Sequence, residues 1–139
     1  PPAQGRGRSL PQNRRRRALC QDAIEDGTLQ TPPLSGTILP GITRNSLIAL
    51  AHDMGLTVRE ERYGIDQWKA DAASGRFVEV FACGTAAVVA PIGQVKGKGY
   101  DLTVNGGEPG PVTARLKKAL TDIKFGRAPD PRHWRERVV

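Results

Sequence analysis

Cysteine, aromatic residues and long apolar runs are all scarce in this 139-residue chain. The two cysteines, Cys20 and Cys83, lie far apart in the sequence and suggest neither a metal motif nor a disulfide framework. We therefore expect a reducing, cytoplasmic compartment and no metal site. No run approaches the roughly 18 apolar residues of a membrane-spanning helix, so no membrane partner is predicted.

Acidic residues are missing from the first twenty positions, which hold six arginines. The rest of the chain carries fifteen basic and fourteen acidic side chains, so the net charge of +7 belongs mainly to this first segment. A segment so rich in Pro, Gly and Arg buries too little apolar surface to offset its ordering entropy. We predict that residues 1–27 are a basic leader, disordered or foreign to the domain, and that residues 28–139 form one partial domain.

The arginines of the leader are also typical of an arm that binds nucleic acid. Tryptophan, tyrosine and phenylalanine number only two, two and three, and none stands between the arginines. Stacking partners for bases are therefore missing, and no nucleic-acid partner is expected.

Helical and strand patterns alternate through residues 28–139, which predicts an α/β fold. Apolar residues at helical spacing predict a helix up to Met54 and another from Pro111 to Ile123. Asp66 is the predicted N-cap of a further helix that ends at Gly75. Strands are predicted at residues 56–58, 77–83, 87–95 and 101–104.

Two short loops combine a glycine with a hydroxyl side chain. Gly41 precedes a predicted helix, so the N–H groups of Ile42 and Thr43 have no acceptor within that helix. The positive end of the helix dipole stabilises a nearby anion by up to about 2 kcal/mol. Gly84 and Thr85 interrupt a strand pattern and leave backbone N–H groups uncovered. We interpret both as anion-binding loops and expect them to lie on the same side of the molecule. A turn at Gly41 and a bulge at Gly84, with no ligand, are the structural alternatives.

Catalytic motifs are not evident elsewhere. The chain has no H-x-x-x-H, C-x-x-C, G-x-S-x-G or Walker pattern. His52 and His133 have no serine or carboxylate partner in a recognisable motif, so we predict that both are surface or packing residues. Trp68 is predicted in the core, and Trp134 is the one large apolar residue of an irregular tail.

Four segments in this order resemble the C-terminal part of the branched-chain amino acid aminotransferases, which are pyridoxal-phosphate enzymes of fold type IV. They read TPPLSGTILPGITRNSL, EVFACGTAAVVAPIG, GPVT and FGRAPDPRHW. The resemblance runs from about residue 28 to residue 139. It implies a mixed β-sheet or pseudo-barrel with flanking helices, and amino transfer between leucine, isoleucine or valine and 2-oxoglutarate. Family members form homodimers.

The resemblance also implies roles for the two loops. One of their anions would be the phosphate of pyridoxal 5′-phosphate and the other the carboxylate of an amino-acid or 2-oxo-acid substrate. The implied cofactor-binding residues are Leu39, Gly41, Ile42, Thr43, Gly84 and Thr85, with Leu39 near the pyridine ring. The implied substrate-binding residues are Ala86 and Ala87, through their N–H groups.

Transamination needs a lysine that forms a Schiff base with the cofactor, and a carboxylate opposite the pyridine nitrogen. In the family both lie further upstream than the 38 residues that precede Leu39 here. We therefore assign no catalytic residue and expect a truncated chain that is inactive alone. A non-catalytic module that binds phosphate, cofactor or a partner is the alternative.

Overall fold

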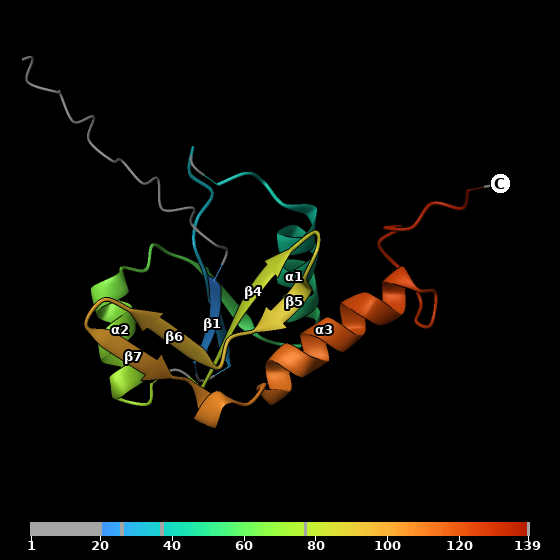
Figure 1. Cartoon of the computed structure of the whole chain (residues 1–139). Coiled ribbons are helices and arrows are strands. Elements are labelled where there is room, and N and C mark those ends of the chain that lie inside the picture. The colour runs from blue at the N-terminus through green and yellow to red at the C-terminus, as the bar shows by residue number, and fades with distance from the viewer. Residues whose placement is uncertain (1–20, 26, 37, 77, 139) are drawn as a thin grey trace, which may run out of the picture.

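The computed structural model describes residues 21–25, 27–36, 38–76 and 78–138, and the predicted disorder of residues 1–20 lies outside them. Figure 1 shows an α/β arrangement in which two helices flank a sheet and a third helix lies beside a hairpin. The elements in chain order are β1 (Gln21–Glu25), β2 (Thr28–Thr31), α1 (Ile42–Asp53), β3 (Thr57–Glu60), α2 (Ile65–Ala73), β4 (Glu79–Gly84), β5 (Val88–Pro91), β6 (Gln94–Gly97), β7 (Tyr100–Thr103), the 3₁₀ turn η1 (Asn105–Gly107) and α3 (Pro111–Lys124).

The main sheet is mixed and has five strands in the order β3-β2-β1-β4-β5. β2 and β3 pair in parallel and are joined through α1, whereas the other neighbours are antiparallel. β6 and β7 form a separate antiparallel hairpin. The predicted α/β class with a mixed sheet and flanking helices is therefore confirmed.

Helices α1 and α3 pack on each other and against the main sheet (Figure 1). Their apolar stripes meet Phe81 and Val89 of the sheet in one core cluster. Leu47 and Leu50 contribute from α1, and Leu116, Leu120 and Ile123 from α3. The helical spacing of these residues predicted both helices, and Gly55 ends the first with a φ of +77°.

A second, smaller cluster joins α2 to the hairpin. Trp68 is 5% exposed and packs with Val80 and Val104, which confirms its predicted core position. Val80 and Phe81 are neighbours on β4 but belong to different clusters, because successive side chains of a strand point to opposite faces. β4 is therefore shared between the two clusters.

The predicted leader, residues 1–27, includes one strand of the main sheet. β1 lies inside the predicted leader, yet its backbone pairs with β2 on one side and β4 on the other. Its sequence QDAIE is too polar to signal a strand by itself. Backbone pairing with both neighbours places it in the sheet regardless of that composition.

Two local predictions are wrong. Helix α2 begins at Ile65 with Gly64 as its N-cap, so Asp66 lies in the first turn and not at the cap. Residues 87–95 form no single strand but contribute to β5 and β6, which belong to different sheets. β5 ends at Pro91, although the next residue, Ile92, still donates its N–H to the Val80 carbonyl at 2.8 Å. An added Cβ at Gly93 would lie 2.4 Å from the Gly107 carbonyl oxygen, so the chain packs closely where it changes direction.

Candidate functional site

The start of α1 presents backbone N–H groups to one end of the molecule. Gly41 is its N-cap in an extended conformation and makes no side-chain cap bond. The first helical hydrogen bond runs from Asn45 N–H to the Gly41 carbonyl at 3.0 Å. Helix geometry therefore leaves the N–H groups of Ile42 and Thr43 without an acceptor in α1. They lie at the positive end of its dipole.

The turn between β4 and β5 is the second predicted loop. Gly84 pairs with Val88, so Thr85, Ala86 and Ala87 form a three-residue turn, and all three are exposed. Val88 closes this turn with a φ of +56°, which is unfavourable for a β-branched residue. The turn is therefore held in a strained conformation, as is common at ligand-binding segments.

A pocket of about 280 Å³ joins the two loops. Ile42, Thr43 and Ser46 line it from α1, and Thr85 lines it from the turn. Leu120, Ile123 and Lys124 line it from the last turns of α3, and Trp134 and Arg135 from the tail. The expectation that the two loops lie on the same side of the molecule is met. Among the described residues, the pocket lining offers hydroxyl groups, an apolar wall and two cationic side chains, and it includes no acidic residue.

Asp130 holds in place the two tail residues that line the pocket, Trp134 and Arg135. One carboxylate oxygen accepts the Trp134 N–H at 3.1 Å and the other accepts the Arg135 N–H at 2.9 Å. The Trp134 hydrogen bond, supported by the Arg135 N–H and by the charges of Arg135 and His133, holds the pKa of Asp130 below its usual value. Trp134 packs against the main core cluster, so the turn at residues 130–135 is fixed at both ends.

The other predicted site residues lie outside the pocket lining. Leu39 is 88% exposed and lines a shallow hollow formed by residues 34–36 and 38–40, next to the start of α1. Gly41 and Gly84 flank the pocket loops in sequence, and Ala86 and Ala87 follow Thr85 in the exposed turn.

Sequence reasoning missed six lining residues. Leu120 and Ile123 were recognised only as core positions, and Trp134 only as an apolar anchor. Lys124 and Arg135 carried no local signal, because only the packing of α3 and the tail against α1 brings them to the pocket. Ser46 lies one turn beyond Ile42 on α1, and this spacing alone could have placed it on the pocket side.

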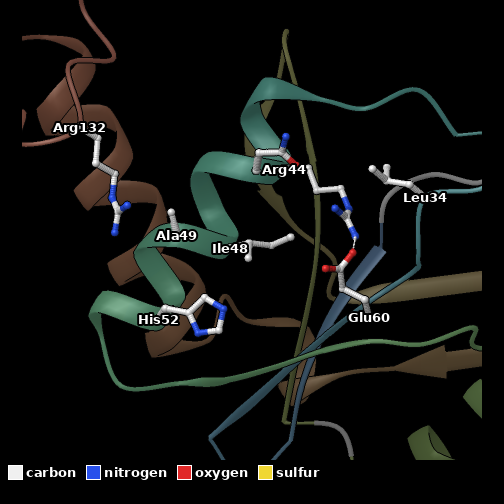
Figure 2. Close-up of a pocket in the computed structure, with 8 residues that line it drawn as sticks. Leu34, Arg44, Ile48, Ala49, His52, Glu60 and Arg132 are labelled. Carbon is white, nitrogen blue, oxygen red and sulfur yellow. Dashed lines mark hydrogen bonds and ion pairs between the residues drawn. The ribbon is translucent and has the colours of Figure 1, made fainter.

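A second groove, of about 400 Å³, lies along α1 (Figure 2). Arg44 is 3% exposed and donates from its guanidinium to the Pro32 carbonyl at 2.8 Å and to Glu60 at 2.7 Å. At the far end of the groove Arg132 pairs with Asp53 at 2.7 Å. Its arginines are therefore neutralised by carboxylates, and the Arg44–Glu60 pair serves to link α1 to β3. His52 also lines the groove and is exposed.

Within the part of the chain that the structure describes, no three His, Cys, Asp or Glu side chains are grouped so that they could hold a metal ion. No helix in those same residues has the length and apolarity to cross a membrane. His133 is exposed.

The profile of the amino-transferase class IV family matches residues 23–95, which include both loops. The chain belongs to this family.

Curated relatives are similar over most of the chain. A probable branched-chain-amino-acid aminotransferase of Streptomyces coelicolor is 50% identical over 104 residues, 75% of this chain and 29% of that protein. The branched-chain-amino-acid aminotransferase of Mycobacterium tuberculosis is 47% identical over 110 residues, 79% of this chain and 30% of that protein. The chain thus spans less than a third of the length of either relative.

Solved structures resemble the fold as well. Branched-chain amino acid aminotransferase of Escherichia coli has a TM-score of 0.69 at 34% identity, covering 84% of this chain and 36% of that one. A branched-chain amino acid aminotransferase solved in complex with N-(5′-phosphopyridoxyl)-L-glutamate has a TM-score of 0.70 at 31% identity, covering 84% and 35%. The similarity therefore extends to fold type IV aminotransferases at the level of structure.

Proposed function

We propose that this chain forms the phosphate-binding part of a branched-chain amino acid aminotransferase that uses pyridoxal 5′-phosphate. The pocket that joins the start of α1 to the turn at Thr85 carries this proposal. The relatives named as branched-chain aminotransferases support the substrate class. The scarcity of cysteine agrees with a cytoplasmic location.

The residues of the pocket fit the phosphate end of the cofactor. The N–H groups of Ile42 and Thr43 have no acceptor in α1 and would donate to phosphate oxygens. Gly41 has no side chain to block that approach. The Thr85 hydroxyl lines the same pocket and would donate a further bond. Lys124 and Arg135 favour an anion there, and among the described residues no lining carboxylate opposes it.

Pyridoxal phosphate supplies the electron sink that amino-group transfer requires. The described residues would bind and orient it. Leu39 reaches out from the loop before α1 and would contact the ring. In the strained turn after Gly84, the N–H groups of Ala86 and Ala87 would hold the carboxylate of the amino-acid or 2-oxo-acid substrate. No lysine of this chain is assigned the Schiff-base role. We further propose that the chain takes part in a homodimer, as the resemblance to the family implies.

Binding of pyridoxal 5′-phosphate and of pyridoxal to the full chain, followed by calorimetry, tests the phosphate site. The wild-type chain is expected to bind the phosphorylated compound more tightly. Thr85→Val should weaken that binding by about 1.5 kcal/mol, roughly tenfold, because one hydrogen bond to a charged group is lost. Thr57→Val, an exposed threonine of β3, is the matched control and should leave the affinity unchanged. Equal binding of pyridoxal and its phosphate would contradict the proposal.

The alternative is a module that binds the cofactor phosphate without turnover. The pocket lining supplies hydroxyl and cationic groups for an anion, and this alternative requires nothing further. Amino transfer from leucine to 2-oxoglutarate, measured with the loaded chain, separates the two. Absence of both turnover and a borohydride-trapped lysine adduct, with binding intact, would assign the chain the binding role only.

A further inference from the structure

The pocket between α1 and α3 contains a cationic side chain that neither loop motif includes. Lys124 is the last residue of α3, is exposed and lines the pocket. The walls that face it carry Thr43 and Thr85, the residues proposed above to bind phosphate. We propose that Lys124 is an anion-binding residue of this pocket and donates to the phosphate group held there. This inference rests on the proposed function.

Charge pairing distinguishes Lys124 from the other cation of the pocket. Arg135 lies 3.7 Å from the carboxylate of Asp130, measured from its Nε, and its own N–H is bonded to the same carboxylate. The guanidinium of Arg135 also packs over Gly126, where an added Cβ would lie 2.5 Å from it. The Arg135 charge is therefore partly neutralised and its position is fixed beside the end of α3.

Lys124 has no such partner in the part of the chain that the structure describes. Among the described residues, no carboxylate lies within 4.0 Å of its Nζ, although Lys118 on the same helix pairs with Asp122. The negative end of the helix dipole favours a cation at the C-terminus of α3. This explains why a basic residue stands there, but not why its side chain lines the pocket. Lys124 lines a pocket to which the described residues contribute no acidic group, and the helix start that lines the same pocket also favours an anion.

Lysine suits this role because its flexible stem lets the ammonium follow a phosphate oxygen as a point charge. A phosphate monoester carries close to two negative charges at neutral pH. The start of α1 and the charge of Lys124 approach such a group from different walls of the pocket. Together with Arg135 they match a dianion better than a single carboxylate.

The test uses pyridoxine 5′-phosphate and pyridoxine, which have no aldehyde and so cannot react with an amine. Each is titrated into the full chain, with the fluorescence of Trp134 as the signal because this side chain lines the pocket. Lys124→Gln should weaken binding of the phosphate compound about tenfold at low salt and leave pyridoxine binding unchanged. Lys124→Arg should keep most of the affinity.

Lys117→Gln is the matched control, since Lys117 is an exposed lysine two turns earlier on α3 and does not line the pocket. It should change the affinity less than about twofold. An equal loss in both variants would reduce the effect to general electrostatics and overturn the inference. The inference would also be overturned if Lys124→Gln still preferred pyridoxine 5′-phosphate over pyridoxine as strongly as the wild-type chain. In that case the proposed phosphate site would be retained without Lys124. If the wild-type chain does not distinguish the two compounds, the proposed function and this inference both fail.

Discussion

A single buried carboxylate organises the start of α3. Glu79 is 4% exposed, and its Oε1 accepts the Val112 N–H at 2.9 Å. Its Oε2 accepts the N–H and the hydroxyl of Thr113, both at 2.7 Å. The side chain thus satisfies helix N–H groups that would otherwise lack acceptors, and it places a negative charge at the positive end of the dipole. This contact explains why the segment GPVT begins with a glycine, because the carboxylate lies directly against the Cα of Gly110.

Gly110→Ala is expected to destabilise the protein by about 2–4 kcal/mol, because the new Cβ overlaps the Glu79 carboxylate and breaks a buried hydrogen-bond group. Gly64→Ala is the matched control. Gly64 is also an N-cap in an extended conformation, but an added Cβ there meets nothing within 4 Å. Urea denaturation of both variants gives the free energies of unfolding. Equal free energies would show that the Glu79 contact does not restrain position 110.

The order of the tail depends on one ionised group, the carboxylate of Asp130. Asp130 holds residues 134 and 135 through two backbone hydrogen bonds, and Trp134 then closes one side of the pocket. Because those bonds favour the ionised carboxylate, the pKa of Asp130 lies below its usual value of 3.8. The resulting stabilisation is complete above pH 3.8 and is lost as the pH falls through the lowered pKa of the folded state.

Asp130→Asn is expected to release the tail already at pH 7, because the amide cannot accept both bonds with the strength of a carboxylate. Acrylamide quenching of tryptophan fluorescence measures this, since Trp68 is 5% exposed and contributes little. The quenching constant should be higher in Asp130→Asn than in the wild-type chain at pH 7. The increase that the wild-type chain shows as Asp130 is protonated at low pH should be absent in the variant. Asp122→Asn is the control, because the low pKa of Asp122 comes from hydrogen bonds to Lys118 and Arg127, away from Trp134. An unchanged quenching constant in Asp130→Asn would count against the tail's dependence on this carboxylate.

Across the whole molecule, β4 makes one folding unit of two core clusters. Phe81 is fully buried between the sheet and the helices α1 and α3, and Val80 is 2% exposed on the side of α2 and the hairpin. Damage to either cluster must therefore be transmitted through β4 to the other. We expect both clusters to unfold in a single transition.

Phe81→Leu, in a Trp134→Phe background, tests this coupling. It should lower the free energy of unfolding by about 1–2 kcal/mol. The same shift should be reported by Trp68 fluorescence, which senses the other cluster, and by circular dichroism. Val78→Ala changes an apolar residue that is 49% exposed, three positions earlier, and should alter stability by less than about 0.5 kcal/mol. A Trp68 transition that stays in place while the dichroism shifts would show two independent units.

The sequence predicted the elements whose patterns repeat, and missed those made by tertiary contacts. Helical spacing at Leu47, Leu116 and Leu120 located α1 and α3, and the apolar residues of FVEVFAC located β4. The polar β1 could not be found in this way, because pairing on both sides places it in the sheet. The break between β5 and β6 depends on close packing of Gly93 against Gly107, which no local pattern encodes.

In the candidate site, too, the sequence predicted the parts with a local pattern and missed those that depend on tertiary packing. The two loops were predictable, because unsatisfied N–H groups at a helix start and small residues in a turn are local properties. That both loops line one pocket was expected, and the pocket bears this out. The walls from α3 and the tail were not foreseen, since Lys124 and Arg135 reach the pocket only through the docking of these segments. The binding roles of Ile42, Thr43, Thr85, Ala86 and Ala87 stay predictions.

The order of the main sheet has a consequence for how copies of this chain meet at high concentration. Among the described strands, β3 and β5 form the two rims. The β3 rim exposes the charges of Arg59 and Glu60, which repel an incoming strand unless it is complementary. The β5 rim ends at Pro91, which cannot donate, and begins at Val88 with a left-handed backbone. Both rims therefore interrupt regular ladder growth, and open-ended polymerisation through strand addition is disfavoured.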